Sequence, residues 1–256
     1  MSNSRNFGGD TVIVTGGGSG IGRATAVAFG EAGANVVVAD VDREGGEQTA
    51  ASIAETAGDA TFVAVDVTDS GDVEAMVETA VSEYGGLDIA FNNAGIGGTF
   101  DATDEISEAD WQALMDVNLS GVWRCLRAEI PAMLEDGGGA IVNTASILGK
   151  VGEANTPAYT AAKHGVVGLT KVAALERATD DIRVNAVCPG YIETEMLEAA
   201  GVTTDEEMRA ETEALHPMGR FGTADEIADA VLWLASDEAS FATGETLAID
   251  GGYLSR

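Results

Sequence analysis

Seven short runs rich in Val, Ile and Ala recur along the chain, and longer segments of helical period separate most of them. Such nearly continuous apolar runs are typical of parallel strands that helices cover on both faces. The predicted strands are 11–15, 35–40, 61–66, 88–92, 140–145, 182–188 and 246–250. The predicted helices are 21–33, 43–57, 70–84, 107–136, 157–179 and 224–236. Repeated strand–helix–strand units with right-handed crossovers predict an α/β fold with an open, doubly wound, mostly parallel seven-stranded sheet.

No linker rich in Pro or Ser interrupts this alternation, so residues 1–256 are predicted to form a single domain. Residues 191–218 depart from the rhythm, because they are acidic and helix-prone and lie between two proline-containing breaks. They follow the end of a predicted strand, where ligands of open α/β sheets bind. We therefore expect a substrate lid at about 191–218, although a surface helix without a gating role would give the same pattern.

The chain is strongly acidic, with 43 Asp and Glu residues against 13 Lys and Arg and a net charge of −30. Such a surface repels phosphate backbones and anionic lipids, so we expect neither a nucleic acid nor a membrane partner. The carboxylates are scattered and lysine is scarce, which favours a halophilic protein over an ordinary acidic one. The first ten residues lack an apolar signal-peptide core, and no apolar run approaches about 18 residues, so we expect a cytoplasmic protein.

A glycine-rich turn follows the first predicted strand directly and opens a helix. Glycine lets the backbone turn tightly and lets its amides approach a pyrophosphate without intervening Cβ atoms. The helix N-terminus adds unpaired N–H groups and the positive end of its dipole. Because the turn lies between a strand and a helix, it predicts a dinucleotide site. The cofactor-binding residues expected here are Gly16, Ser19, Gly20, Ile21 and Gly22.

Two aspartates at predicted strand ends bear on the choice of cofactor. Asp40 ends the second strand, where a carboxylate can accept both hydroxyls of an adenosine ribose and would repel a 2′-phosphate. Arg43 lies three positions on, but no basic residue follows Asp40 immediately, so the predicted cofactor is NAD rather than NADP. Asp66 ends the third strand and, with Val67, is expected at the adenine edge; an aspartate that caps a turn or helix is the alternative.

Tyr159 and Lys163 are spaced to share one face of a helix, with Ser146 thirteen residues before the tyrosine. A free tyrosine has a pKa near 10, and lowering it by about 3 units requires about 4 kcal/mol of differential stabilisation. A nearby ammonium group and an oxidised nicotinamide both stabilise a phenolate, because both are positive. The Tyr–Lys spacing alone is common on ordinary helices, so its meaning depends on the motifs around it.

Those motifs resemble the short-chain dehydrogenase/reductase family over essentially the full chain. The matching segments are Thr15 to Gly22, Asn92-Asn93-Ala94-Gly95, Asn118, Ser146 with Tyr159 and Lys163, Pro189-Gly190, and Asp250-Gly251-Gly252. The resemblance implies a single-domain Rossmann fold and an oxidoreductase that transfers a hydride between NAD and a secondary alcohol or ketone. It also implies a homotetramer, built from the long fourth and fifth helices and the C-terminal strand.

The resemblance implies a role for each matching residue. Tyr159 would be the general acid in reduction and the general base in oxidation, and Ser146 would hold the substrate oxygen. Tyr159 and Lys163 would both contact the cofactor as well. Lys163 would bind the nicotinamide ribose and lower the tyrosine pKa, while Asn118 would anchor a water that relays protons. The cofactor would also meet two further segments. They comprise Asn92, Ala94 and Gly95 beside adenosine, and Pro189, Gly190, Ile192 and Thr194 at the nicotinamide carboxamide.

The substrate is less constrained by the sequence. It is expected to meet the loop 147–155, Gly97-Gly98 and the lid, where several apolar residues point either to an apolar pocket or to ordinary core contacts. Lys150 and Glu153 are polar enough to contact a hydroxylated substrate, but solvent exposure is the expected role of both. A small secondary alcohol is the preferred substrate, with a 3-oxoacyl thioester or a sugar as alternatives. His164 and His216 lack the spacing of a metal site, so no metal is expected.

Overall fold

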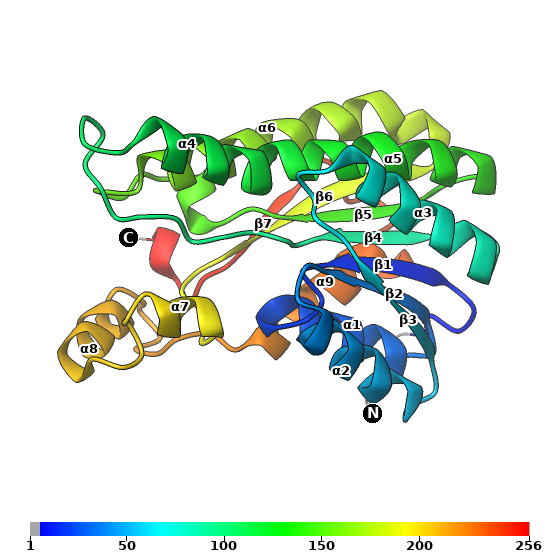
Figure 1. The fold of residues 1–256 in the computed structure, drawn as a ribbon, viewed down its shortest axis with the longest axis horizontal. Helices are drawn as coiled ribbons and strands as arrows, with labels where there is room; N and C mark the ends of the chain where they lie inside the picture. The colour runs from blue at the N-terminus through cyan, green and yellow to red at the C-terminus, as the bar shows by residue number, and fades with distance from the viewer. Residues whose placement is uncertain (1–5, 256) are drawn as a thin grey trace.

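Every strand of the central sheet is parallel to its neighbours, in the order β3-β2-β1-β4-β5-β6-β7 (Figure 1). The computed structural model describes residues 6–255. The strands are β1 Thr11–Thr15, β2 Asn35–Asp40, β3 Asp59–Ala64, β4 Ile89–Asn92, β5 Gly139–Thr144, β6 Ile182–Pro189 and β7 Thr246–Ile249. The predicted doubly wound α/β fold of the Rossmann type is therefore confirmed.

Helices cover both faces of this sheet, which explains why its strands carry nearly continuous apolar sequence. One face packs against α3 Ser70–Tyr84, α5 Val122–Asp136 and α6 Pro157–Arg177, and the other against α1 Gly20–Glu31, α2 Arg43–Ala54 and α9 Ala224–Ala235. Adjacent residues of one strand enter opposite cores: Ile13 packs with the α3 side, whereas Val12 and Val14 pack with the α1 side. The apolar side chains of β1 thus hold both helical layers.

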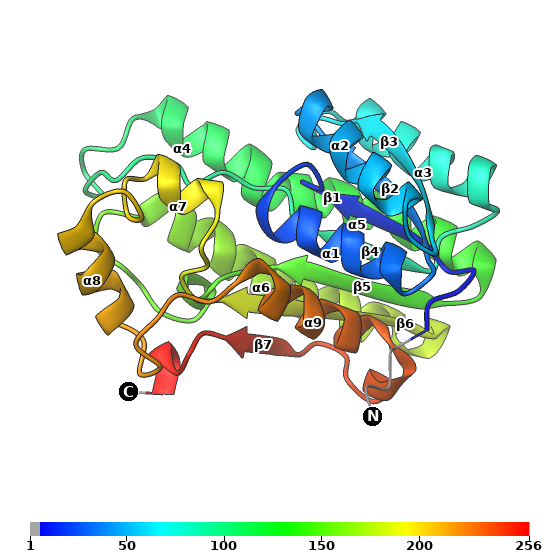
Figure 2. The same cartoon turned by 90° about the horizontal axis from the view of Figure 1, so that it is seen from below.

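The strand order reverses between β1 and β4, and ligands of such sheets bind at this switch point, beyond the carboxyl ends of the strands. The short helices α7 Glu195–Ala199 and α8 Glu206–Ala214 lie at that end of the molecule, toward which the β5 and β7 arrows point (Figure 2). They belong to the segment 191–218 that was predicted to be a lid.

Two boundaries differ from the sequence prediction. The third strand was predicted at 61–66 but spans Asp59–Ala64, because its register with β2 pairs Asn35 with Asp59 and Asp40 with Ala64. Asp66 therefore lies beyond the strand end. The helix predicted at 107–136 is divided into α4 Glu108–Met115, a π-helical turn at Asp116–Gly121 and α5. Between residues 6 and 255, no helix is both long and apolar enough to cross a bilayer.

Candidate active site

The glycine-rich turn packs so closely that side chains are excluded from it. Gly16 has a φ of 66°, in the left-handed region that favours glycine. A Cβ atom on Gly22 would lie 1.9 Å from the carbonyl oxygen of Gly16, so the first turn of α1 rests directly on the backbone that precedes it. Gly20 faces the side chain of Thr194, whose Cγ2 atom would lie 3.3 Å from an added Cβ. The turn therefore joins the end of β1 to the segment that follows β6.

The N-terminus of α1 fits the pyrophosphate of a dinucleotide. The N-cap residue, Ser19, has an extended backbone. Within the described part of the chain, the Ser19 side chain makes no capping hydrogen bond, and the first turn of α1 holds no acidic residue. Helices α3 and α9, by contrast, are capped by the side chains of Asp69 and Thr223. In a chain with net charge −30, this helix end keeps its N–H groups and its positive dipole end available to an anion.

Asp40 lies beside this turn at the end of β2. Its Oδ2 accepts a hydrogen bond from the amide of Gly18 at 2.8 Å, and its Oδ1 accepts one from the amide of Asp42 at 2.9 Å. These two bonds fix the carboxylate at the edge of the predicted adenosine site. Arg43 is held by other partners, since its Nη1 lies 3.1 Å from Glu47 Oε1 and its Cζ lies 5.5 Å from the Phe62 ring centroid.

Asp66 shapes the turn that follows β3. Its Oδ1 accepts hydrogen bonds from the amide of Thr68 at 2.8 Å and from the Thr68 hydroxyl at 2.7 Å. The side chain is exposed, while the neighbouring Val67 is buried. Asp66 thus has the turn role that the sequence left open as an alternative, and its expected contact with adenine remains a prediction.

The segment after β4 is fixed to the first strand through Thr15. The Thr15 hydroxyl accepts hydrogen bonds from the amides of Asn93 at 2.9 Å and Ala94 at 3.2 Å. The Asn93 side chain donates to the carbonyl of Thr15 at 3.2 Å and accepts from the Thr144 hydroxyl at 3.2 Å. The amide and hydroxyl groups of these residues join β1, β4 and β5 at the switch point, which places Ala94 and Gly95 beside the glycine-rich turn.

Asn92 points away from this cleft into the protein. Its Nδ2 donates to Glu129 Oε2 at 3.0 Å and to Asn143 Oδ1 at 3.1 Å, and Asn143 in turn donates to the Thr170 hydroxyl at 3.0 Å. All four side chains are buried. The side chain of Asn92 therefore supports the sheet from the α5 and α6 side. Sequence analysis missed Glu129, because a carboxylate on a helix is usually exposed.

Tyr159 and Lys163 face each other on α6. The Lys163 Nζ lies 5.6 Å from the centroid of the Tyr159 ring and donates a hydrogen bond to the carbonyl of Thr144 at 2.7 Å. Burial lowers the pKa of Lys163 to about 8. Burial raises the pKa of Tyr159, and a hydrogen bond with Ser146 opposes that rise. The three side chains therefore form one group in which the charge of each depends on its neighbours.

Ser146 occupies the end of β5, where a short 3₁₀ turn begins. Its Oγ accepts a hydrogen bond from the amide of Leu148 at 3.1 Å, which holds the hydroxyl oxygen in place. Its side chain is only 8% exposed. The hydroxyl hydrogen can then be directed to an oxygen atom in the cleft.

Asn118 lies in the π-helical turn, and its side chain holds the loop after β4. Its Oδ1 accepts from the amide of Ile96 and its Nδ2 donates to the carbonyl of Ile96, both at 2.8 Å. The side chain is fully buried. Asn118 thus fixes the backbone of this loop at Ile96, and π-helical turns are frequent at functional sites. Its expected role as a water anchor stays a prediction.

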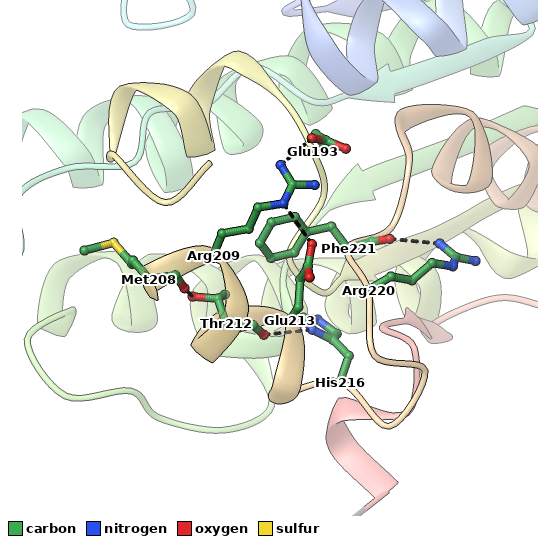
Figure 3. A network of polar contacts seen from close by, with 8 residues as sticks. All are labelled: Glu193, Met208, Arg209, Thr212, Glu213, His216, Arg220 and Phe221. Carbon is green, nitrogen blue, oxygen red and sulfur yellow. Dashed lines mark hydrogen bonds and ion pairs between the residues drawn. The ribbon is translucent and has the colours of Figure 1, made fainter. Parts of the chain in front are cut away.

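An arginine attaches α8 to the segment expected to meet the nicotinamide. Arg209 forms ion pairs with Glu193 and Glu213, each at 2.9 Å, and its Cζ lies 5.2 Å from the Phe221 ring centroid (Figure 3). The expected cofactor contacts Ile192 and Thr194 flank Glu193. Ile192 is buried and forms a parallel bridge with Gly222. Arg209 on α8 therefore contacts both segments that meet at this bridge, through Glu193 and Phe221.

Two loops meet above α6 through a hydrogen bond between side chains. Tyr191, which follows Pro189-Gly190, donates its phenolic hydrogen to Glu153 Oε1 at 2.7 Å. Both side chains are partly buried, so the expectation that Glu153 is exposed was wrong. Sequence gives no signal for this contact, because 38 residues separate its partners. Within residues 6–255, no cluster of three His, Cys, Asp or Glu side chains could hold a metal ion.

Residues 16–254 match a family profile described as enoyl-(acyl carrier protein) reductase. The chain is 45% identical over 253 residues to a cyclohexanol dehydrogenase of Acinetobacter sp. strain SE19, covering 99% of this chain and 98% of that protein. It is 46% identical to a 2,5-dichloro-2,5-cyclohexadiene-1,4-diol dehydrogenase of Sphingobium indicum, covering 96% of this chain and 97% of that protein.

Solved structures agree with these similarities. A carveol dehydrogenase from Mycobacterium avium in complex with NAD superposes with a TM-score of 0.94 at 32% identity, over 97% of this chain and 99% of that one. A putative 2-deoxy-d-gluconate 3-dehydrogenase from Agrobacterium tumefaciens with bound NADP superposes with a TM-score of 0.90 at 38% identity, over the full length of both chains. The similar structures thus include both nicotinamide cofactors.

Proposed function

The chain belongs to the short-chain dehydrogenase/reductase family, and we propose that it is an NAD-dependent dehydrogenase of cyclic secondary alcohols. It is an oxidoreductase of alcohols and ketones, as its relatives are. The observation that carries the proposal is the group formed by Ser146, Tyr159 and Lys163, which lies at the same carboxyl end of the parallel sheet as the glycine-rich turn. Similarity to the cyclohexanol dehydrogenase across nearly the whole chain supports a ring substrate.

In this proposal, the catalytic residues are Asn118, Ser146, Tyr159 and Lys163. When NAD is bound, its nicotinamide accepts the hydride from the carbinol carbon. Ser146 orients the alcohol oxygen, and the phenol oxygen of Tyr159 removes the alcohol proton. Lys163 stabilises the phenolate by its positive charge, which it carries below its pKa of about 8. In reduction, the same phenol returns the proton to the carbonyl oxygen.

A substrate panel followed at 340 nm tests this function. Cyclohexanol with NAD should give a higher kcat/KM than a linear secondary alcohol, a sugar or acetoacetyl thioester. A preference for the thioester with NADPH would instead support a 3-oxoacyl thioester reductase, and a preference for the sugar would support a sugar dehydrogenase. Absence of turnover of every alcohol and ketone in the panel would contradict the proposal.

The preference for NAD depends on Asp40. Replacing Asp40 with Ala removes a charged hydrogen-bond acceptor from the ribose site, which should weaken NAD binding about 10- to 100-fold. It should also relax discrimination against NADP, because the repulsion of the 2′-phosphate is lost. Asp66→Ala is the matched control and should affect both cofactors alike. A wild-type enzyme that prefers NADP would contradict the assignment.

The proposal includes a halophilic, cytoplasmic protein, and the excess of 43 acidic over 13 basic residues supports the halophilic part. Mobile ions shorten the screening length from about 10 Å at 0.1 M salt to about 3 Å at 1 M, which weakens repulsion among carboxylates. The melting temperature should therefore rise as KCl is increased from about 0.1 M to about 2 M. Sucrose of equal osmolality is the control for general exclusion of solute. A flat response to KCl would rule out a halophilic protein.

Large exposed apolar side chains support the homotetramer. Trp111 on α4, Trp123 on α5 and Leu175 on α6 are all exposed, and Phe241 before β7 is fully exposed. Burial of such surfaces against other copies would remove apolar area from water. Light scattering should then give four times the 26.1 kDa chain mass.

The segment 191–218 is proposed to act as the lid of this single domain. The ion pair between Arg209 and Glu193 supports that role, because it connects α8 to the loop of Ile192 and Thr194.

A further inference from the structure

The hydrogen bond between Glu153 and Tyr191 leaves most of the carboxylate available. A carboxylate can accept about four hydrogen bonds, and the Tyr191 hydroxyl occupies one position on Oε1. The Thr156 hydroxyl binds the main-chain carbonyl of Glu153 at 3.0 Å and not its side chain. Burial raises the pKa of Tyr191, and the bond to Glu153 raises it further, so this phenol stays protonated and acts as the donor.

Tyr191 is held rigidly by the residues behind it. Its ring packs edge-on against His216 at 5.7 Å between centroids and tilted against Tyr253 at 6.3 Å. His216 is buried, and its Nε2 accepts a hydrogen bond from the Tyr191 amide at 3.3 Å. Its Nδ1 lies 3.2 Å from the Thr212 carbonyl oxygen. A carbonyl only accepts, so Nδ1 is the donor in that hydrogen bond. The Tyr191 hydroxyl is therefore preorganised toward Glu153.

The pair lies at the same end of the sheet as the reacting group. Glu153 belongs to the loop between the Ser146 turn and α6, and it precedes Tyr159 by six residues. Tyr191 follows β6, which pairs in parallel with β5, and β5 leads to Ser146. Ser146 and Tyr159 hold one oxygen of a substrate, so Glu153 and Tyr191 offer a second set of polar atoms near it.

We propose that Glu153 and Tyr191 form a second polar subsite that binds a hydroxyl group other than the one that reacts. The preferred substrate is then a cyclic diol or hydroxy ketone rather than a simple cyclic alcohol. This inference rests on the proposed function and specifies its substrate class. The substrate hydroxyl donates to the Glu153 carboxylate and packs beside the fixed Tyr191 ring.

The chemistry of the subsite also defines what it rejects. A carboxylate binds a neutral hydroxyl donor but repels a second carboxylate, and a partly buried charge is screened less than an exposed one. A ring alcohol with a carboxylate substituent should therefore be a poor substrate. Three substrates of the same ring size separate these cases: cyclohexanol, 1,4-cyclohexanediol and 4-hydroxycyclohexanecarboxylate.

The experiment compares kcat/KM of the three substrates in wild type, Glu153→Gln and Tyr191→Phe. Wild type should prefer the diol to cyclohexanol by about 10-fold or more, as expected for a hydrogen bond to a charged group. Glu153→Gln should remove most of this preference by raising KM for the diol, while cyclohexanol changes by less than about 3-fold. The same substitution should raise kcat/KM for 4-hydroxycyclohexanecarboxylate relative to kcat/KM for the diol. Tyr191→Phe should lower the diol preference less, because Glu153 remains.

Glu74→Gln is the matched control, since it removes an exposed carboxylate on α3 that pairs with Arg127 at 3.2 Å. Glu74→Gln should leave the kcat/KM values of the three substrates unchanged relative to one another. Equal kcat/KM for the diol and cyclohexanol in wild type, or an unchanged ratio in Glu153→Gln, would overturn the subsite while the proposed function stands. A wild-type enzyme that oxidises none of the three would contradict the proposed function itself. Circular dichroism of each variant verifies that the fold is retained.

Discussion

Replacing Tyr159 with Phe is expected to lower kcat about 10²- to 10⁴-fold, which is the usual contribution of a positioned general acid or base. The substitution removes only the phenol oxygen and keeps the ring that packs beside Leu114, Ala158 and Ala162. The chemical step then lacks its proton acceptor, while Ser146 still contacts the substrate oxygen. Steady-state oxidation of cyclohexanol at saturating NAD measures the loss.

Binding and stability should distinguish a chemical from a structural effect. The affinity of Tyr159→Phe for NAD should stay within about 3-fold of that of wild type, because the substitution removes no hydrogen bond to a charged group. Tyr84→Phe is a matched control on α3, where the phenol donates to the Thr61 hydroxyl at 3.0 Å, and its kcat should not change. A Tyr159→Phe enzyme that keeps more than a tenth of wild-type kcat would contradict the assigned role.

The parts of this molecule that sequence predicts are those fixed by local geometry. The strands are covered on both faces, so their apolar runs are nearly continuous and their positions could be assigned within two residues. The glycine-rich turn has local steric reasons, among them the positive φ of Gly16 and the contact of Gly22 with the Gly16 carbonyl, and it lies next to a strand. The four-residue spacing of Tyr159 and Lys163 follows from helical periodicity alone.

The parts that sequence did not predict depend on contacts between distant segments. The π-helical turn at Asp116–Gly121 has no signature in the apolar pattern, since one wider turn shifts the helical period only slightly. The bond between Glu153 and Tyr191 joins two loops whose meeting depends on the sheet order. Glu129 lies on a helix with exposed acidic neighbours, and only the packing of α5 against the sheet buries it.

That buried carboxylate should make wild type less stable than Glu129→Gln above neutral pH. Glu129 is fully buried, its Oε2 accepts from Asn92 Nδ2 at 3.0 Å, and among the described residues its Oε1 has no hydrogen-bond partner. Burial raises its pKa from 4.5 to about 7, because the ionised form loses its hydration. The folded state therefore favours the neutral acid, and an amide resembles that form.

The sign of the effect follows from the two pKa values. Below about 4.5 the carboxyl is protonated in both states, and its ionisation costs the fold nothing. As the pH rises from about 4.5 to about 7, the unfolded chain loses the proton first, so the free energy of unfolding falls. Above about 7 both states are ionised and the cost levels off at roughly 3 kcal/mol, from 1.36 kcal/mol per pKa unit.

Urea unfolding of wild type and Glu129→Gln at pH 5 and pH 8 measures this difference. The variant should exceed wild type by roughly 2–4 kcal/mol at pH 8 and by much less at pH 5, because Gln has no charge to bury at either pH. Comparing the two proteins at each pH cancels the repulsion that the net charge of −30 adds to both. Glu135→Gln removes an exposed carboxylate from the same helix. Its free energy of unfolding should differ from that of wild type by the same amount at both pH values. If Glu129→Gln is less stable than wild type at pH 8, then the carboxylate is ionised and compensated in the fold, and its burial does not act as inferred here.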